Sequence, residues 1–255
     1  LNLQINVNHK RRIEPELFYR FNINTNFNIT NKKFQSYGAG FYTTPFGEKD
    51  IYEPRTFGRH LNKPVEFTYW LWYESDSRKK FYYNLFGRQT FFNEKARQGY
   101  NLELITKYRF SDHFSISLDS NYERNNKNIG YAGKDSTTGD IFMGQRDVRS
   151  IVNSLISQYT FNDKMMINLA FRHYFSDVAF QQFYTLQNDG SLIHNPTFKS
   201  NDTTFNTWPL CIPAKAFLAF KMGSGQLRPR VSISTSKFMR ETPQSISSDH
   251  LGRTR

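Results

Sequence analysis

Apolar and polar residues alternate along several stretches of this chain. Residues 1–8 read LNLQINVN, and the same alternation recurs at 17–30, 65–74, 100–110, 114–123 and 167–176. Successive side chains of a β-strand point to opposite faces, so each stretch places its apolar groups on one side. Together with the less regular stretches 33–43, 79–91 and 148–161, the pattern predicts an all-β antiparallel meander of about nine strands.

The connections between these stretches are predicted to alternate between tight turns and longer loops. Asn, Asp and Ser form tight turns at residues 31–32, 75–77, 111–112 and 162–163. Longer loops are expected at 46–63, 92–97, 125–140 and 186–205. Short turns at one end and long loops at the other are typical of outer-membrane β-barrels. Several stretches also reach the length of about 9–11 residues that a tilted strand needs to cross a bilayer.

Aromatic residues gather beside the tight turns. They are Phe27 and Phe34, Tyr73 and Phe81, Phe110 and Phe114, and Tyr159 and Phe161. Such rings are typical of headgroup depth in a membrane. A soluble barrel or sandwich would alternate as well, with its apolar face turned inward. Strand length, loop placement and the aromatic positions favour the membrane barrel over this alternative.

Composition and charge narrow the class of protein. The chain holds 25 Phe and 15 Tyr but has a mean hydropathy of −0.68, and no apolar run is long enough for a transmembrane helix. The single cysteine, Cys211, excludes an intrachain disulfide framework. About half of the net charge of +12 lies in residues 209–255, which hold eight Lys or Arg against two acids. No basic face or known module supports a nucleic-acid partner.

The composition divides the chain at residue 208. Residues 1–208, which we assign to a partial β-barrel, contain 23 Asn and 15 Tyr, whereas residues 209–255 contain neither type. We interpret residues 209–255 as an aberrant tail produced by a frameshift, a chimeric join or a truncated gene model. A natural disordered tail is the alternative. The chain begins directly in a strand pattern, which we interpret as a truncation, and we therefore expect unpaired strands at both ends.

The polar faces of the predicted strands supply the candidate functional residues, and no catalytic motif accompanies them. The face is expected to line a lumen through Arg20, Asn22, Asn24, Asn26, Glu103, Lys107, Arg109, Asp119 and Glu123. Neither an H-E-x-x-H spacing nor a G-x-S-x-G elbow is present, so no metal, cofactor or catalytic residue is expected. Glu103, Asp119 and Glu123 are best interpreted as lumen carboxylates that pair with neighbouring cations.

Three segments carry a resemblance to a known family. They are NINTNFNITNKKFQSYGAGFYTTPFGEKDIYEPRTFGRHLNKP, TYWLWYESDSRKKFYYNLFGRQTFFN and KYRFSDHFSISLDSNYERNNKNIGY. They resemble the C-terminal barrel of a Bacteroidota family of unknown function, over residues 1–208. The most specific part is YEPRTFGRHLNKP, with Glu53, Arg55, Gly58, Arg59 and Pro64.

The resemblance implies a location and partners. It implies the outer membrane, contact with its lipid, and a glycan ligand bound by a carbohydrate-binding domain of the family 9 type that precedes the barrel in that family. We expect a channel or surface anchor linked to glycan uptake. A membrane-embedded hydrolase and a soluble β-rich binding protein are the two alternatives.

Overall fold

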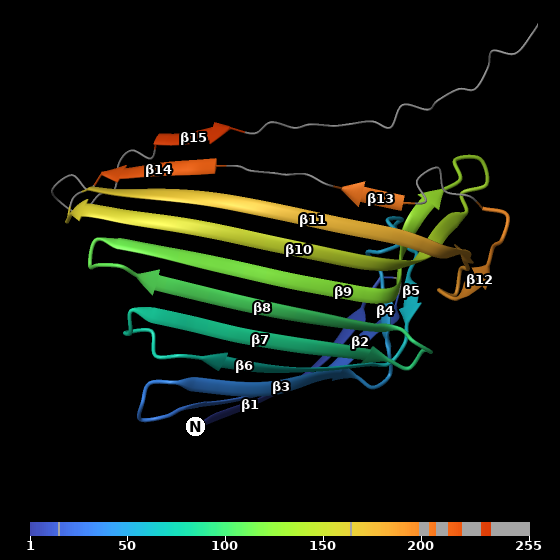
Figure 1. Cartoon of the computed structure of the whole chain (residues 1–255). Coiled ribbons are helices and arrows are strands. Elements are labelled where there is room, and N and C mark those ends of the chain that lie inside the picture. The colour runs from blue at the N-terminus through green and yellow to red at the C-terminus, as the bar shows by residue number, and fades with distance from the viewer. Residues whose placement is uncertain (15, 164, 199–203, 208–213, 221–230, 236–255) are drawn as a thin grey trace, which may run out of the picture.

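The fold is a single curved antiparallel β-sheet, seen in a computed structural model (Figure 1). The structure describes residues 1–14, 16–163, 165–198, 204–207, 214–220 and 231–235. The long strands are β1 (Asn2–Arg12), β2 (Leu17–Thr30), β3 (Ser36–Thr44), β6 (Glu66–Glu74), β7 (Phe81–Phe92), β8 (Gln98–Arg109), β9 (Phe114–Lys134), β10 (Ile141–Asn162) and β11 (Met165–Leu186). The short strands are β4 (Glu48–Asp50), β5 (Leu61–Lys63), β12 (Leu192–His194), β13 (Thr204–Thr207), β14 (Ala214–Phe220) and β15 (Val231–Thr235).

The all-β antiparallel prediction is confirmed. The nine long strands correspond to the nine alternating stretches, and every pair is antiparallel. The sheet order is β15-β14-β11-β10-β9-β8-β7-β6-β3-β2-β4-β5, with β1 beside β2, and over the described ranges the sheet is not closed into a ring. Within residues 209–255, β14 and β15 add to this sheet, whereas the other residues of the proposed tail lie outside the described ranges.

The tight turns form where short polar side chains cap the chain. Asn31 accepts hydrogen bonds from the backbone N–H of Lys33 and Gln35 through its Oδ1, at 2.8 and 3.1 Å, and Phe34 takes a positive φ of 59°. The Oδ1 of Asp76 accepts from the backbone N–H of Arg78 at 3.0 Å in the next turn. These contacts imitate a backbone turn, so they join neighbouring strands with few residues.

One predicted loop is mostly strand. Residues 125–140 were expected to be irregular, yet β9 runs to Lys134 and β10 begins at Ile141, leaving only 135–140 as a connection. The β9 ladder shifts register between Asn125 and Asn128, and Lys127 has a positive φ of 51°. This β-bulge lets the strand continue while it re-aims the side chains beyond it.

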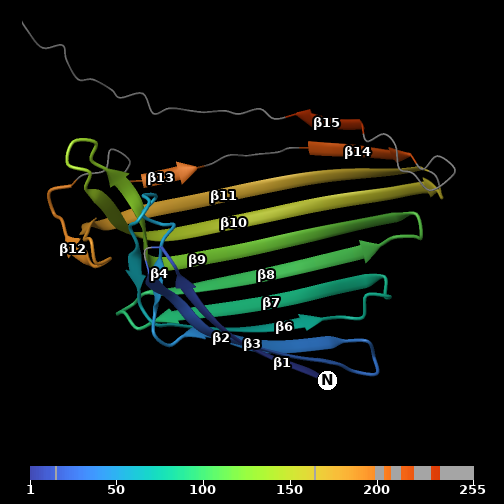
Figure 2. The same ribbon diagram turned by 180° about the vertical axis from the view of Figure 1, so that it is seen from behind.

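A second predicted loop folds into a kinked hairpin. The chain bends after β3 at Gly47, which has a φ of 70° and whose Cβ position would lie 2.5 Å from the carbonyl oxygen of Lys63. Only glycine fits such a close approach with a positive φ. Beyond the bend, β4 and β5 turn away from β3 and β6 and run towards β9 and β12 (Figures 1 and 2). We call residues 48–63 the cross-brace.

A small core lies at the loop end of the sheet. Its five buried apolar residues are Leu61, Ile129, Ile141, Met143 and Leu186, with Tyr131, Tyr184 and Leu192 packed against them. They come from the cross-brace and from the outer halves of β9, β10 and β11. The described residues bury little else of this kind, because most large apolar side chains elsewhere are exposed or half-buried.

Candidate functional site

The candidate lumen residues occupy one face of the sheet. Residues directly opposite each other in antiparallel strands share a face, and one such row runs from Asn26 through Gly40, Trp70, Arg88 and Asn101 to Glu123. Alternation along β2, β8 and β9 places the remaining candidates on the same face, namely Arg20, Asn22, Asn24, Glu103, Lys107, Arg109 and Asp119.

Hydrogen bonds tie neighbouring polar groups of this face together. The Nδ2 of Asn101 donates to the Oδ1 of Asn121 at 3.0 Å, and Arg88 lies 3.9 Å from Glu123. At the other edge, the Nη1 of Arg20 lies 3.4 Å from the Oε2 of Glu48. Of the three carboxylates Glu103, Asp119 and Glu123, Glu123 therefore has a cation nearby, which comes from β7 and which the sequence reading did not name.

The β1–β2 ladder adds a run of amides to the polar face. Asn6 lies opposite Asn24 and Asn8 lies opposite Asn22, so carboxamides face each other across the pair. Within β2, the Nδ2 of Asn26 donates to the Oδ1 of Asn24 at 2.6 Å. Amide side chains both donate and accept, so the row offers neutral polar groups to whatever medium covers it.

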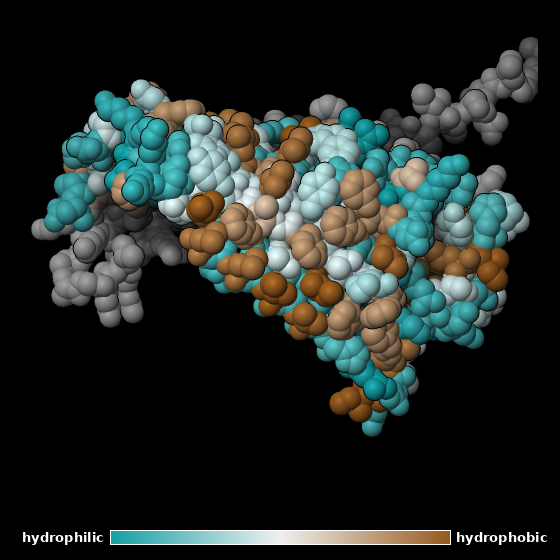
Figure 3. All heavy atoms as spheres, turned by 90° about the horizontal axis from the view of Figure 1, so that it is seen from below, coloured by the Kyte–Doolittle hydropathy of each residue, from teal (hydrophilic) through white to brown (hydrophobic). Residues whose placement is uncertain are grey.

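The opposite face carries an exposed apolar band. Its members in β6 to β11 and in the turn after β8 include Phe67, Tyr69, Leu71, Phe81, Leu85, Phe91, Leu102, Leu104, Tyr108, Phe110, Leu118, Leu155, Tyr159, Phe161, Leu169 and Phe171, each at least 38% exposed. One side of the molecule shows such residues as a band with hydrophilic side chains at both ends (Figure 3). The band ends at a polar row in which Tyr100, Arg124, Arg149 and Asp177 lie side by side.

Aromatic rings follow the tight-turn edge of the band. Tyr73 lies 5.2 Å from Tyr37 and 5.5 Å from Tyr83, measured between ring centroids. Further along the edge the contacts Tyr108–Phe110, Phe110–Phe114 and Tyr159–Phe161 measure 4.7, 5.0 and 4.8 Å. Of the aromatic residues that the sequence singled out beside the turns, Tyr73, Phe81, Phe110, Phe114, Tyr159 and Phe161 make ring contacts along this edge.

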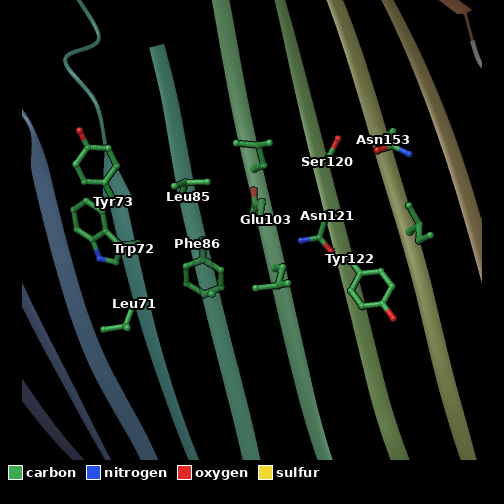
Figure 4. A pocket seen from close by; sticks show the side chains of 14 residues that line it. Leu71, Trp72, Tyr73, Leu85, Phe86, Glu103, Ser120, Asn121, Tyr122 and Asn153 are labelled. Carbon is green, nitrogen blue, oxygen red and sulfur yellow. The ribbon is translucent and has the colours of Figure 1, made fainter.

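A shallow depression of about 610 Å³ interrupts the band. Gly87 lies between Leu71 and Leu102 in the register, so a side chain is missing from that row. Leu71, Leu85, Ser120 and Asn153 reach this depression from β6, β7, β9 and β10 (Figure 4). Sequence reasoning missed it, although a glycine inside an alternating strand could have marked it.

The family-like segment forms the tip of the cross-brace. The Oε1 of Glu53 accepts a hydrogen bond from the backbone N–H of Tyr131 at 2.8 Å, and the guanidinium of Arg55 lies 4.7 Å from the centre of the Tyr131 ring. Arg59 donates through Nη2 to the carbonyl oxygen of Leu186 at 2.7 Å. These contacts join the segment to the outer halves of β9 and β11.

Gly58 and Pro64 of that segment determine the course of its backbone. Gly58 has a φ of 80°, a conformation that favours glycine. Pro64 follows β5 directly and stands between it and β6, where the hairpin kinks. Both residues therefore position the cross-brace, and neither contributes a polar side chain to the polar face.

His60 and Asn62 attach the cross-brace to the loop after β11. The Nε2 of His60 lies 3.1 Å from the carbonyl oxygen of Asp189. The backbone N–H of Asn62 donates to the carbonyl oxygen of Gly190 at 2.9 Å. Burial, and then the charge of Lys49, lower the pKa of His60 against a smaller opposing effect from Asp189. The sequence analysis placed Asp189 and Gly190 within the long loop expected at 186–205 and did not foresee this contact.

Asp50 anchors the base of the cross-brace. Burial alone would raise its pKa, but a hydrogen bond with Lys63 and further ones from the backbone N–H of Glu53 and Tyr52 lower the pKa overall. The carboxylate therefore stays charged and joins β4 to β5. Among the described residues, no group of three His, Cys, Asp or Glu is placed to hold a metal ion.

Comparison with known families decides the affiliation of this fold. Residues 1–225 match the family described as Domain of unknown function (DUF5916). The chain belongs to the DUF5916 family. The match continues past residue 208, where the composition changes, so the DUF5916 region includes β14.

The family name carries no activity with it. No curated protein and no solved structure matches the DUF5916 chain. In the part of the chain that the structure describes, no helix is long and apolar enough to cross a membrane. The function must therefore be argued from the two faces of the sheet and from the cross-brace.

Proposed function

We propose that this sheet is part of the wall of an outer-membrane β-barrel, with its apolar band against lipid and its polar face towards a water-filled interior. In this arrangement the chain acts as a channel or surface anchor. The observation that carries the proposal is the height of the exposed apolar band, which matches the thickness of a bilayer.

The height follows from the register. The band covers residues 102–110 of β8 and the turn after it, 114–122 of β9 and 151–161 of β10, which is nine to eleven residues along each strand. At about 3.4 Å per residue and a tilt of about 40°, these lengths give a band of roughly 25 Å. A lipid-facing band of an outer-membrane barrel is about 25 Å tall.

The borders of the band support the same orientation. Aromatic rings follow its tight-turn edge, and Tyr100, Arg124, Arg149 and Asp177 follow the other edge. Interfacial aromatic rings and polar groups are expected where a barrel wall leaves the hydrocarbon. In water, an apolar surface of this extent would be a strong site for association.

The polar face favours passage or retention of a polar solute. Its amides, carboxylates and guanidinium groups can hydrogen-bond a hydrated molecule without a covalent step. The alternative of a membrane-embedded hydrolase requires a nucleophile and a base in one cleft, and the sequence contains no motif for them. The glycan ligand implied by the family resemblance stays a prediction, which a carbohydrate-binding assay would test.

Spin labels on four consecutive residues of β8 test the orientation. In a background with Cys211→Ser, single cysteines at Leu102, Glu103, Leu104 and Ile105 are labelled in lipid vesicles. Oxygen, which concentrates in lipid, is expected to relax labels 102 and 104, and a water-soluble nickel complex is expected to relax 103 and 105.

Three outcomes separate the candidates. A period of two with this phase supports a membrane wall, whereas the opposite phase, or four labels that water reaches equally, refutes it. A chain that stays monomeric in buffer without detergent favours the soluble binding protein. Conductance across a planar bilayer then distinguishes a channel from a surface anchor.

A further inference from the structure

Two of three neighbouring tight turns at one end of the sheet are strongly basic. Turns 31–35, 75–80 and 110–113 contain fifteen residues, of which five are Lys or Arg and two are Asp. The five cations are Lys32, Lys33, Arg78, Lys79 and Lys80, and all of them are exposed. We call these three turns the basic rim.

Contacts between the turns hold the rim together. The guanidinium of Arg78 lies 3.4 Å from the centre of the Phe34 ring, so the second turn packs on the first. Arg109, at the end of β8, donates through Nη2 to the carbonyl oxygen of Ser77 at 2.9 Å, which joins the third turn to the second. The cations therefore lie on one surface rather than on independent loops.

The acids of the rim leave most of its charge free. Asp76 is held by Arg78, with the Nε of the guanidinium 2.9 Å from Oδ1 and its Nη2 2.8 Å from Oδ2. Among the ion pairs found in the described residues, none includes Lys32, Lys33, Lys79 or Lys80. At the loop end, by contrast, Lys63, Arg97 and Arg146 each lie near a carboxylate.

The position of these lysines identifies what they would meet. They follow directly on the aromatic row formed by Tyr37, Tyr73 and Tyr83 at the edge of the apolar band. We propose that the basic rim binds the phosphate headgroups of anionic phospholipids in the leaflet at the tight-turn end. This inference rests on the proposed membrane orientation, since only that orientation brings headgroups to the depth of the rim.

Two properties of the lysines suit a headgroup. Each ammonium is a compact charge on a long flexible stem, so it can reach a phosphate while the stem stays beside the aromatic rings. Each cation near an anionic surface strengthens binding about fivefold at low salt. Removing two of them should weaken the preference for anionic lipid by about 25-fold at most, and added salt should weaken it as well.

The experiment compares spin-labelled phosphatidylglycerol with spin-labelled phosphatidylcholine at the surface of the full chain in phosphatidylcholine vesicles. The expected result is a clear preference for phosphatidylglycerol that falls in the variant Lys79→Gln/Lys80→Gln. The matched control is Lys95→Gln/Lys134→Gln, which removes two exposed cations beyond the opposite edge of the band. This control should keep the preference.

The outcomes separate this inference from the proposed function. A chain that inserts with the β8 labelling pattern but shows no headgroup preference overturns only the proposal that the basic rim binds anionic headgroups. An acidic soluble partner would then be the alternative ligand of the rim. An equal loss of preference in the control variant also overturns it, because net charge would then be the cause. A chain that does not insert at all overturns both proposals.

Discussion

Truncation of Leu61 is expected to open the cross-brace while the sheet stays folded. Leu61 is 1% exposed and packs in the small core with Ile129, Ile141, Met143 and Leu186. In closely packed cores a Leu→Ala change costs about 2.7–5.0 kcal/mol, the sum of lost burial and of the cavity that remains. We expect about 3 kcal/mol for Leu61→Ala, since a core of five side chains at the end of a sheet can partly collapse.

Amide hydrogen exchange measures this opening directly. The N–H of Asn62 donates to Gly190 and the N–H of Tyr131 donates to Glu53, so both report on the closed cross-brace. A loss of about 3 kcal/mol corresponds to exchange about 150-fold faster, because each 1.4 kcal/mol is a factor of ten. Amides in the middle of β8 should exchange as slowly as before.

The matched control is Leu71→Ala. It removes the same atoms from a side chain that is 60% exposed on the apolar band, and it should leave the Asn62 and Tyr131 amides unchanged. The reasoning is refuted if Leu61→Ala leaves those two amides protected, or if it accelerates exchange throughout the sheet by the same factor.

Three further predictions concern charge. As the pH falls from 6.5, the unfolded chain protonates His60 before the folded chain does, because the pKa of His60 is lowered by folding. The cross-brace should therefore lose stability from pH 6.5 down to the lowered pKa of the folded state. Amide hydrogen exchange measured at pH 7.5 and 5.5 should show this loss, and the variant His60→Gln should abolish it. Leu104→Arg would place a charge on the lipid-facing side and should lower the free energy of unfolding in lipid vesicles by about 2–4 kcal/mol. Ile105→Arg, on the opposite face, should lower it by less than about 1 kcal/mol, and denaturant unfolding measures both values. Equal costs would contradict a lipid-facing Leu104. The Arg78 guanidinium lowers the pKa of Asp76 to about 2, so Arg78→Gln should return the pKa towards 3.8 in a carboxyl NMR titration, and an unchanged pKa would contradict the pairing.

The long strands could be predicted because alternation is a local property. Six of the nine follow from side chains that point to opposite faces in turn, three more were visible as less regular stretches, and Asn31 and Asp76 mark two of the tight turns. The placement of the nine polar candidates on one face follows from the same rule. The orientation of that face towards a lumen stays a prediction.

The outer half of β9 escaped prediction because a bulge changes the phase of the alternation. Tyr122 lies opposite Ile151, and Tyr131 lies opposite Met143, so an even-numbered and an odd-numbered residue of β9 share a face. A rule that counts every second residue loses the strand at such a point. The Asn-rich sequence around the bulge also resembles a loop.

The cross-brace could not be predicted for a different reason. Its contacts join residues far apart in the sequence, such as Glu53 with Tyr131, 78 positions apart, and His60 with Asp189, 129 positions apart. No period in the sequence encodes such contacts. The segment was noticed only as a family-like motif, without a structural role. The structure supplies that role, because Glu53 and Arg59 bind backbone groups of β9 and β11.

The unequal lengths of the strands give the loop end a stepped rim. β7 and β8 have 12 residues each, whereas β9, β10 and β11 have 21 or 22, and the difference corresponds to a step of about 30 Å. At the loop end, β7 and β8 are too short to block a molecule that approaches from their side of the sheet. Such a molecule meets the cross-brace instead, so the attachment of the cross-brace at Gly190 determines the width of the opening beyond β7 and β8.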